Sequence, residues 1–548
     1  MNIKILDLIQ RETDQPVKHI LLMAALSGIA NAGILALVNT AADQALDLGE
    51  ASVRLLVMFV ATILLYFFTK KKALMESSIL VEKVINSVRL RMIDKLRLSD
   101  LRTLDNIGES KFYNVLTEDA RALSTSTPIL VNAFQSAIML GFCLLYLGLL
   151  SVVAFGVTVA MVAGAVMVYL ANAEQVRVNL ENATHEETHF FDFMSHIIGG
   201  FSENKVYQKR NDALFHNFLS RSLNRALTLK VNAQKLLVGN FMFAQVFFYV
   251  LLAVIVFVLP RFDHLDGDII TKTTAAILFI IGPLENIVSA APVLARANVA
   301  INNLETMEAH IDAEATKDKP ATPQQIKKLS QFQTLTMNKI TFCYRDREGR
   351  DGFPLGPVNL TINRGETLFI IGGNGSGKST VMRLLTGLYY PRSGQIRCDN
   401  TVINSENYQA FREQFSLIMS DFHLFDRFYG LEDVDTDRVQ ELIDYMEMDE
   451  IVSYSEGRFS NINLSTGQRK RLAMITTLLE NKPICVFDEW PADQDPTFRR
   501  RFYTEILPQL KEQGKTVIAI SHDDHYFHCA DRILKMFEGN FVPYDGKM

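Results

Sequence analysis

The sequence predicts a multi-domain membrane protein, in which a six-helix transmembrane domain is followed by an α/β domain with a phosphate-binding loop. Six long apolar stretches precede residue 300. A polar segment with Pro320 and Pro323 follows them and marks a domain boundary. Beyond it, short apolar runs alternate with helical patterns, which is typical of a mostly parallel sheet. The predicted parts are residues 1–311, a linker at 312–330, and residues 331–548.

The six apolar stretches are each long enough to cross a membrane, whose hydrocarbon core of about 30 Å takes about 20 helical residues. The third and fourth are continuous, because no Asp, Glu, Lys or Arg occurs between Arg121 and Glu174. That run is too long for one span, so it predicts a hairpin that turns near residues 149–151. The N-terminal stretch is too long for a cleavable signal and predicts a signal anchor. The stretches are residues 17–41, 51–69, 127–149, 151–173, 236–260 and 270–293.

Loop charge predicts the orientation of these helices. Nine Lys and Arg residues lie in residues 70–102, after the second stretch, and eight lie in residues 177–235, after the fourth. The loops at residues 41–51 and 260–269 are mainly acidic and should face outward. The two basic segments, both termini and the α/β domain are therefore expected in the cytoplasm.

Both basic segments are long, and their apolar residues recur at helical spacing, as in residues 79–85. This pattern predicts that the membrane helices continue into the cytoplasm. They should turn near residues 101–118 and 190–200, where their tips would contact the α/β domain. A separate amphipathic helix on the membrane surface is the alternative.

Four polar residues within the apolar stretches are candidates for a substrate path. Glu285 is the clearest, because an intramembrane carboxylate is costly and usually faces a cavity or a partner. The amides of Gln135, Asn240 and Gln245 would line the same kind of path. The alternative for each residue is a hydrogen bond between helices.

Composition excludes several classes of protein. Hydrophobic residues make up 48% of the chain, mean hydropathy is +0.11 and the net charge is −6. No basic field suggests nucleic acid as a partner, and none is expected. The five cysteines are scattered without a C-x-x-C pair, so they predict reduced structural thiols rather than disulfides or a zinc site.

A phosphate-binding loop occupies residues 372–380, Gly-Gly-Asn-Gly-Ser-Gly-Lys-Ser-Thr. It follows an apolar run and precedes an apolar-periodic stretch, so buried strand, glycine-rich turn and helix start come in order. The glycines let backbone N–H groups approach phosphate oxygens, and the helix N-terminus adds partial positive charge. We expect Lys378 to reach the β- and γ-phosphates of ATP and the Ser379 hydroxyl to hold Mg²⁺. The other loop residues expected to contact ATP are Gly372, Asn374, Gly375, Ser376, Gly377 and Thr380.

A second motif, residues 483–489, is an apolar run that ends in two carboxylates. Asp488 is expected to hold Mg²⁺. Glu489 follows it at the mouth of the strand, where it would orient and deprotonate the attacking water. A strand that ends in Asp-Glu is weak evidence alone, but about 110 residues after a phosphate loop it is strong.

The third motif, Leu464-Ser-Thr-Gly-Gln468, resembles the Leu-Ser-Gly-Gly-Gln signature of the ATP-binding cassette (ABC) family, with Thr466 in place of the first glycine of the pair. Three further residues match the pattern of that family. The resemblance implies that Tyr344 stacks on adenine, that Asp495 is the aspartate of the D-loop, and that His522 contacts the γ-phosphate.

The resemblance also implies a composite site. In ABC proteins ATP lies between the phosphate loop of one domain and the signature of another. Ser465, Thr466, Gly467 and Gln468 would therefore complete the ATP site of a partner. One copy of each motif beside six spans predicts a half-transporter that works as a homodimer.

Two positions depart from the family pattern. Ser420 stands where the family has a glutamine near Mg²⁺ and the attacking water, and its shorter hydroxyl would contact them weakly or through a water, with Asp421 able to share the role. Trp490 and its neighbours follow Glu489, where most members have small residues. Neither departure removes Lys378, Asp488 or Glu489, so ATP hydrolysis is still expected.

The same departures resemble one branch, the bacterial cyclic-peptide exporters of the pyoverdine and syringomycin type. The similar segments are residues 420–425, 488–490, 492–496 and 521–526. The resemblance implies ATP-driven export of a cyclic or nonribosomal peptide, such as a siderophore or its precursor, across the bacterial inner membrane. The alternatives are export of a lipid or drug, import of a metal–siderophore complex by the same fold, and an ATP-gated regulator that does not pump.

Overall fold

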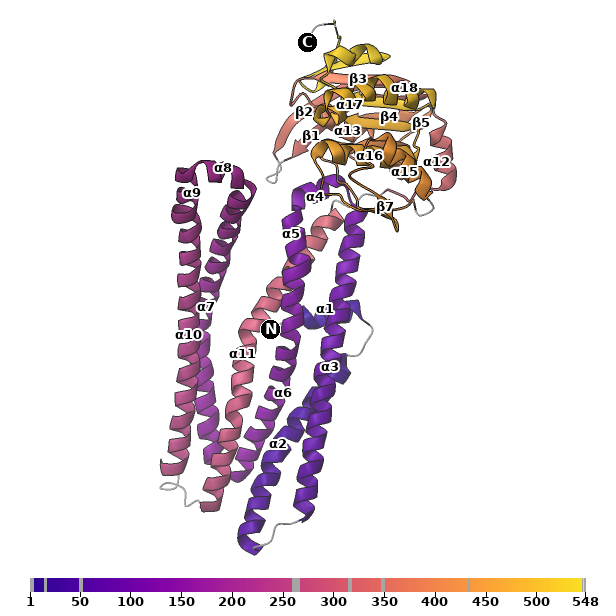
Figure 1. Ribbon diagram of the computed structural model, residues 1–548. Coiled ribbons are helices and arrows are strands. Elements are labelled where there is room, and N and C mark those ends of the chain that lie inside the picture. Colours follow the sequence, from indigo (N-terminus) through magenta and orange to yellow (C-terminus); the bar gives the residue numbers. More distant parts are fainter. Residues whose placement is uncertain are drawn as a thin grey trace. The chain divides into compact units, whose positions relative to one another are not determined.

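The computed structural model describes residues 4–13, 17–48, 53–258, 267–313, 318–345, 350–431, 434–544 and 546. The chain divides into two compact units. Unit 1 is Met1–Arg91 with Tyr113–Thr306, and unit 2 is Met92–Phe112 with Met307–Met548. The division cuts two long membrane helices, so their ends belong to unit 2 together with the α/β fold (Figure 1).

Six helices in the described residues are long and apolar enough to cross a membrane, as predicted. The predicted hairpin is confirmed: the first of its two helices ends at Leu150, and the second begins at Val152. Ser151 caps the second helix by accepting a hydrogen bond from the backbone N–H of Ala154. Of the first loop expected to face outward, residues 41–48 are the end of the helix Val17–Leu48, and residues 49–51 lie outside the described residues. Most of the second loop, residues 260–266, also lies outside them.

The helices of unit 1 and the membrane-helix ends run in chain order and include π-helical turns at Val115–Asp119, Leu214–Leu219 and Val254–Val258. Their bounds are α1 Lys4–Glu12, α2 Val17–Leu48, α3 Val53–Arg97, α4 Leu101–Ile107, α5 Glu109–Asn114, α6 Ala120–Leu150, α7 Val152–Gly199, α8 Phe201–Val206, α9 Gln208–Ala213, α10 Ser220–Ala253 and α11 Gly267–Ala313.

The helices α3 and α7 are much longer than a bilayer core. They have 45 and 48 residues, which is about 70 Å of helix each. The predicted extension beyond the membrane is therefore confirmed, and the alternative of a separate surface helix is wrong. The second turn lies at Gly200–Tyr207, beyond the predicted residues 190–200, because nothing before the glycine pair at 199–200 breaks the helix.

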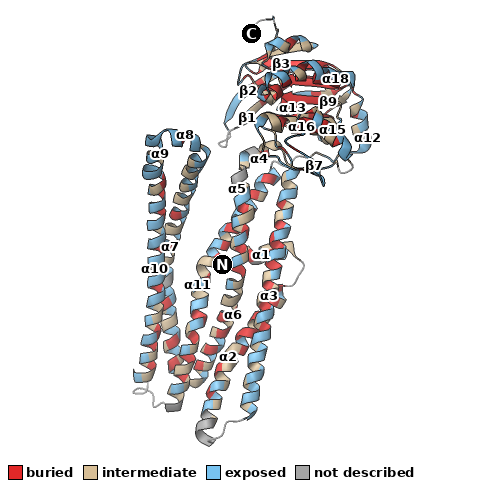
Figure 2. Cartoon of the chain, in the orientation of Figure 1, coloured by how far each residue is buried: buried red, intermediate tan, exposed pale blue. Residues whose placement is uncertain are grey.

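Apolar side chains in unit 1 divide into a packed cluster and a large exposed set. The cluster joins α2, α6, α7, α10 and α11, and includes Leu147, Leu251 and Ile280 with almost no exposed surface. The exposed set covers much of α3, where Leu56 and Phe68 are each 62% exposed. Figure 2 shows the exposed faces of these helices in pale blue. A lipid or protein neighbour is required to cover such faces.

Unit 2 contains a mostly parallel sheet, as the sequence predicts. Its six strands have the order β12-β11-β3-β10-β9-β6, and all neighbours except β11 and β12 are parallel. The strands β9 and β10 are buried at every position, which explains their continuous apolar sequence. A second, antiparallel sheet has the order β2-β1-β4-β5. Figure 2 shows buried strands of unit 2 in red, with helices packed beside them.

The elements of unit 2 begin after the linker, of which residues 314–317 lie outside the described residues. The helices are α12 Pro323–Ser330, α13 Lys378–Leu385, α14 Tyr408–Arg412, α15 Thr436–Tyr445, α16 Thr466–Glu480, α17 Pro496–Arg501 and α18 Leu507–Glu512, with shorter turns at Trp490–Asp493, Phe502–Ile506 and Asp524–Cys529. The strands are β1 Thr334–Arg345, β2 Asp351–Asn363, β3 Thr367–Gly372, β4 Ser393–Cys398, β5 Thr401–Val402, β6 Phe415–Ile418, β7 Tyr454–Ser455, β8 Arg458–Phe459, β9 Ile484–Asp488, β10 Thr516–Ile520, β11 Arg532–Phe537 and β12 Asn540–Val542.

The short helix α4 packs on the α/β fold within unit 2. Its first residue, Leu101, contacts the apolar core beneath the antiparallel sheet. The guanidinium of Arg102 lies 5.5 Å from the ring centre of Phe342 on β1. The prediction that the first cytoplasmic turn contacts the α/β domain is therefore confirmed.

All five cysteines are free, as predicted. Among the described residues, no group of three or more His, Cys, Asp or Glu side chains is placed to hold a metal ion.

Candidate functional site

The phosphate loop joins β3 to α13 with backbone that only glycine adopts easily. Gly375 and Gly377 have φ angles of +75° and +103°, in the left-handed region. A Cβ at Gly372 would lie 2.3 Å from the carbonyl oxygen of Met536, so a side chain is excluded there. The loop therefore presents bare backbone at the N-terminus of α13, with Asn374 exposed at its tip.

Lys378 and Ser376 face into this loop. Lys378 is 6% exposed, and its Nζ donates to the carbonyl oxygens of Gly372 at 2.9 Å and Gly373 at 3.0 Å. Burial lowers the pKa of Lys378, while the nearby carboxylates of Glu489 and Asp488 oppose that change. The Ser376 hydroxyl is buried without a hydrogen-bond partner among the described residues. A cation and an unsatisfied donor in a glycine cradle fit phosphate oxygens.

Three oxygen-bearing side chains meet at the end of β9. Asp488 is 1% exposed, and burial raises the pKa of its carboxyl, which a hydrogen bond from Ser379 partly offsets. The Ser420 hydroxyl donates to Asp488 Oδ2 at 3.3 Å. Hard oxygen ligands beside a phosphate site fit Mg²⁺, which keeps most of its waters. Asp421, next to Ser420, instead forms an ion pair with Arg383 at 2.7 Å.

Glu489 and His522 approach each other at the carboxyl edge of the sheet. Glu489 directly follows β9, and His522 follows the neighbouring strand β10. His522 Nε2 lies 3.1 Å from Glu489 Oε1, and both side chains are partly exposed. Because parallel strands end at one edge, the two motifs separated in sequence meet here. A carboxylate beside an imidazole at this edge has the groups needed to bind a water molecule and accept its proton.

Tyr344 lies beside the phosphate loop on β1. Its hydroxyl is 3.1 Å from Thr380 Oγ1, and its ring meets Phe342 and Tyr389 edge-on at centroid distances of 5.1 and 5.9 Å. The side chain is 37% exposed. An exposed, supported aromatic ring next to the loop fits the stacking of an adenine base.

The signature residues begin α16 and are held by a capping box. The Ser465 hydroxyl accepts the backbone N–H of Gln468, whose side chain accepts the N–H of Ser465. Ser465 and Thr466 are exposed at this helix N-terminus. Gly467 has no room for a side chain, because a Cβ would lie 2.5 Å from the carbonyl oxygen of Asp493.

Asp495 holds the start of α17. Its carboxylate accepts the backbone N–H groups of Thr497 and Phe498 at 3.0 Å each and pairs with Arg471 at 2.6 Å. The N–H of Phe498 above all keeps the pKa of Asp495 below its usual range. In this chain Asp495 therefore fixes the segment after Glu489.

Sequence reasoning missed two residues next to Glu489, Lys470 and Asp493. The Lys470 Nζ lies 2.6 Å from Asp493 Oδ2 and donates to the carbonyl oxygen of Glu489 at 2.7 Å. Trp490 is fully buried, stacks on Phe502 and donates to the carbonyl oxygen of Lys470 at 2.9 Å. In the sequence, only the opposite charges of Lys470 and Asp493 could have indicated that the two side chains pair.

The four candidate substrate-path residues come from α6, α10 and α11. Asn240 is buried and accepts a hydrogen bond from Asn172 of α7 at 2.6 Å, which supports the helix-packing alternative. Gln135 is buried, Gln245 is half-buried and Glu285 is exposed. Asn286, next to Glu285, donates to Ser136, next to Gln135, at 3.1 Å. The turns that carry Glu285 and Gln135 are therefore neighbours.

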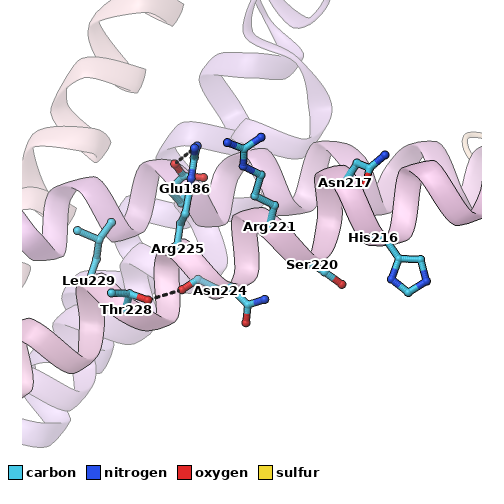
Figure 3. Close-up of a pocket in the computed structure, with 9 residues that line it drawn as sticks. All are labelled: Glu186, His216, Asn217, Ser220, Arg221, Asn224, Arg225, Thr228 and Leu229. Carbon is cyan, nitrogen blue, oxygen red and sulfur yellow. Dashed lines mark hydrogen bonds and ion pairs between the residues drawn. The ribbon is translucent and has the colours of Figure 1, made fainter.

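An open groove of about 790 Å³ lies along the start of α10 and the π-helical turn before it. It is lined by Glu186 of α7 and by His216, Asn217, Ser220, Arg221, Asn224, Arg225, Thr228 and Leu229. Figure 3 shows Glu186 paired with Arg225, at 3.5 Å. None of the predicted path residues lines this groove.

Known proteins resemble this chain in both its ATP-binding part and its full length. The family model described as ABC transporter matches residues 355–492. The ATP-binding protein SyrD of Pseudomonas syringae pv. syringae is 29% identical over 95% of this chain and 93% of its own length. The energy-coupling factor transporter ATP-binding protein EcfA1 of Mycoplasma pneumoniae is 31% identical over 34% of this chain and 70% of its own length.

A solved structure matches the whole architecture. It is a bacterial Atm1-family ABC exporter with ATP bound, with a TM-score of 0.72 at 19% identity, covering 96% of this chain and 94% of that chain. Six membrane-length helices and one matching ATP-binding unit correspond to half of a complete transporter. The chain therefore belongs to the ABC transporter family, as a half-transporter with the Atm1-family exporter fold, and its family binds ATP and couples ATP hydrolysis to transport.

Proposed function

We propose that the protein is a homodimeric exporter that uses ATP hydrolysis to move a cyclic or nonribosomal peptide, such as a siderophore or its precursor, out of the bacterial cytoplasm across the inner membrane. The observation that carries the proposal is the Glu489–His522 pair beside Asp488 and Lys378, in a chain similar to SyrD along almost its whole length. The peptide cargo rests on the resemblance of residues 420–425 and 488–496 to cyclic-peptide exporters.

In this proposal residues 1–311 form the transmembrane domain, residues 312–330 the linker and residues 331–548 the ATPase domain. Glu285, Gln135, Asn240 and Gln245 are the candidates for contact with cargo. Glu285 is the strongest of them, because an exposed carboxylate in a membrane helix needs a cavity or a partner.

The homodimer follows from the placement of the signature. Ser465 and Thr466 lie exposed at the N-terminus of α16, where backbone N–H groups and the helix dipole favour an anion. The chain has one such signature and one phosphate loop. A second copy of the chain would bring its signature to the phosphates held by Lys378, and the two sites would be equivalent.

The chemistry assigned to this chain's residues is a displacement at phosphorus. Lys378 and the loop N–H groups hold the phosphates, and Asp488, Ser379 and Ser420 supply oxygens toward Mg²⁺, which stabilises charge on the phosphates when bound. Glu489 takes a proton from a water molecule, and the oxygen of that water attacks the γ-phosphorus. The bond between the γ-phosphorus and the bridging oxygen of the β-phosphate breaks at the same time. His522 holds the Glu489 carboxylate in place. Products are ADP and phosphate. Because Leu101 and Arg102 pack on the α/β fold, α4 would move with that fold and could pass a change at the ATP site to the membrane helices.

The test of cargo class is ATP hydrolysis by the full chain in lipid nanodiscs with a panel of compounds. The panel contains a cyclic lipopeptide, a metal-free peptide siderophore, its ferric complex, a lipid A-type lipid and a hydrophobic cationic drug. We expect one or both metal-free peptides to raise the turnover number several-fold. Stimulation by the lipid, drug or ferric complex alone contradicts the peptide assignment, and a rate that no compound changes favours the regulator.

A further inference from the structure

Lys470 is a buried cation next to the catalytic carboxylate. Its side chain is 3% exposed, although it lies on α16 only two residues after the signature. Burying an ammonium group is costly unless it is paired and hydrogen-bonded. The two partners are the carboxylate of Asp493 at 2.6 Å and the backbone carbonyl of Glu489 at 2.7 Å. The charge therefore stabilises one arrangement of the chain that runs from Glu489 to Asp493.

The backbone of Glu489 needs this support. Its φ angle is +51°, in the left-handed region, which is unfavourable for a residue that carries a side chain. Four contacts with described residues hold it. Its N–H donates to the carbonyl oxygen of Ile520 at 3.3 Å, and its carboxylate meets His522. Its carbonyl oxygen accepts from Lys470 and, at 3.3 Å, from the backbone N–H of Ala492. Of these, the Lys470 contact is the shortest and carries a full charge. Backbone strain at functional residues persists only where the surroundings fix it.

The contacts around Lys470 join α16 to the segment after Glu489. Trp490 Nε1 donates to the carbonyl oxygen of Lys470 and Gln494 Nε2 to that of Gly467, both at 2.9 Å. A Cβ at Gly467 would strike the carbonyl oxygen of Asp493. Trp490 therefore holds the backbone of Lys470, while the side-chain Nζ of Lys470 reaches Glu489.

We propose that Lys470 is a positioning residue for ATP hydrolysis, which fixes the backbone of Glu489 in the same chain so that its carboxylate faces the attacking water. Asp493 keeps Lys470 charged and aimed. The inference rests on the proposed ATPase function. Lys470 acts on the rate of the chemical step and leaves ATP binding to Lys378 and the phosphate loop.

The first experiment compares Lys470→Met with Lys482→Met in the full-length protein. Lys482 forms an ion pair with Glu413 at 2.8 Å, elsewhere in unit 2 and away from the phosphate loop, so it controls for the loss of a lysine pair. We expect Lys470→Met to lower kcat by about 10- to 100-fold with KM for ATP within about threefold, and Lys482→Met to leave both near wild type. Asp493→Asn keeps the shape of the site, so it should also lower kcat with little change in KM, though by a smaller factor. This variant keeps the test informative if Lys470→Met folds poorly.

Two results overturn the inference. One is a normal kcat in Lys470→Met, and the other is a loss that appears in KM or in the binding of a fluorescent ATP analogue. Absence of hydrolysis by the wild-type protein contradicts the proposed function instead, so the two failures are distinguishable.

Mixed dimers test whether Lys470 acts within its own chain. Each pairs one Lys470→Met substitution with one Glu489→Gln substitution, and single-turnover cleavage of bound ATP is compared with that of a wild-type and Glu489→Gln mixed dimer. With both substitutions in one protomer, we expect the amount and rate of cleavage to be unchanged, because that protomer's own base is already lost. With the substitutions in opposite protomers, we expect the remaining cleavage to slow by the same 10- to 100-fold factor as in Lys470→Met. The reverse pattern overturns the inference, because it would place the action of Lys470 in the signature offered to the partner.

Discussion

The two units differ in how their functional residues are positioned. In unit 2 Asp488, Glu489 and His522 meet at the ends of neighbouring strands, and close packing at Gly372 excludes any side chain. In unit 1 the helices are well defined, but the polar side chains within them bond to neighbouring helices or are exposed, as Asn240 and Glu285 show. The residues of the phosphate site are thus adjacent in sequence or on neighbouring strands, whereas a cargo path depends on the faces of several helices.

The largest expected effect tests the claim that unit 2 is an intact ATPase. Replacing Lys378 with alanine removes the buried cation that faces the phosphates, so hydrolysis should fall about 100-fold or more. The measurement is phosphate release by the purified protein in nanodiscs. Lys327→Ala on the exposed face of α12 is the control and should leave the rate unchanged. Hydrolysis by Lys378→Ala near the control rate would place the nucleotide elsewhere.

A second substitution tests whether close packing against Asp493 requires glycine at position 467 of the signature. Gly467→Ala would place a Cβ 2.5 Å from the carbonyl oxygen of Asp493, and such overpacking costs about 1–3 kcal/mol. We expect a lower thermal midpoint and slower hydrolysis. Gly352→Ala is the control, because the nearest atom to its Cβ would be at 3.4 Å. Equal midpoints for the two variants would show that α16 can move away from Asp493 at little cost.

The pH dependence of Mg²⁺ binding tests whether the Asp488 carboxylate binds Mg²⁺. Burial raises the pKa of Asp488, so the folded protein holds this proton more tightly than the unfolded chain does. The resulting stability is present below the unfolded pKa of 3.8 and is lost as pH rises through the folded pKa. Mg²⁺ requires the carboxylate, so its affinity should weaken as pH falls, by up to about tenfold per unit below the folded pKa.

Ser420→Ala provides the matched variant for this titration. The Ser420 hydroxyl donates to Asp488 and holds its pKa down, so the variant should move the Mg²⁺ profile to higher pH by less than about one unit. The readout is the Mg²⁺ concentration for half-maximal hydrolysis between pH 8 and pH 5, with ATP saturating. A profile identical to wild type would show that Ser420 does not act on Asp488.

The smallest expected effect concerns unit 1. It tests whether the buried polar residues of this unit pack helices, in contrast to the functional residues of unit 2. If Asn172 and Asn240 only pack helices, a double-mutant cycle with leucine should give a coupling energy of about 0.6–1.7 kcal/mol and leave cargo-stimulated hydrolysis intact. Thermal unfolding in nanodiscs and the stimulated rate are both measured. Loss of stimulation with no change in stability would instead assign Asn240 to the cargo path.

Much of the fold follows from the sequence because its determinants are local. Apolar stretches of sufficient length give the six helices, and the uncharged run before Glu174 gives the hairpin at Ser151. Helix α7 ends later than the sequence predicts, because the helix continues up to the glycine pair at residues 199–200. The loop, Asp488 and Glu489 were recognisable since strand, turn and residue type are adjacent in sequence.

Other parts of the site depend on contacts that no local pattern contains. The pairing of Lys470 with Asp493 joins residues of α16 to a turn beyond β9, and Asp421 turns toward Arg383 rather than toward Asp488. Both outcomes depend on which element packs beside which. Physical proximity, rather than residue type, decides the role of such side chains.

The most direct test of the central claim is transport by the full chain in proteoliposomes with the ATPase units facing outward. Uptake of a labelled cyclic lipopeptide into the lumen is followed after addition of ATP and Mg²⁺. The account predicts uptake by the wild type and by the exposed-carboxylate control Glu512→Gln, and none above background by Glu489→Gln, which should still bind ATP. Uptake by Glu489→Gln at the wild-type rate, or ATP hydrolysis without uptake by the wild type, would contradict it.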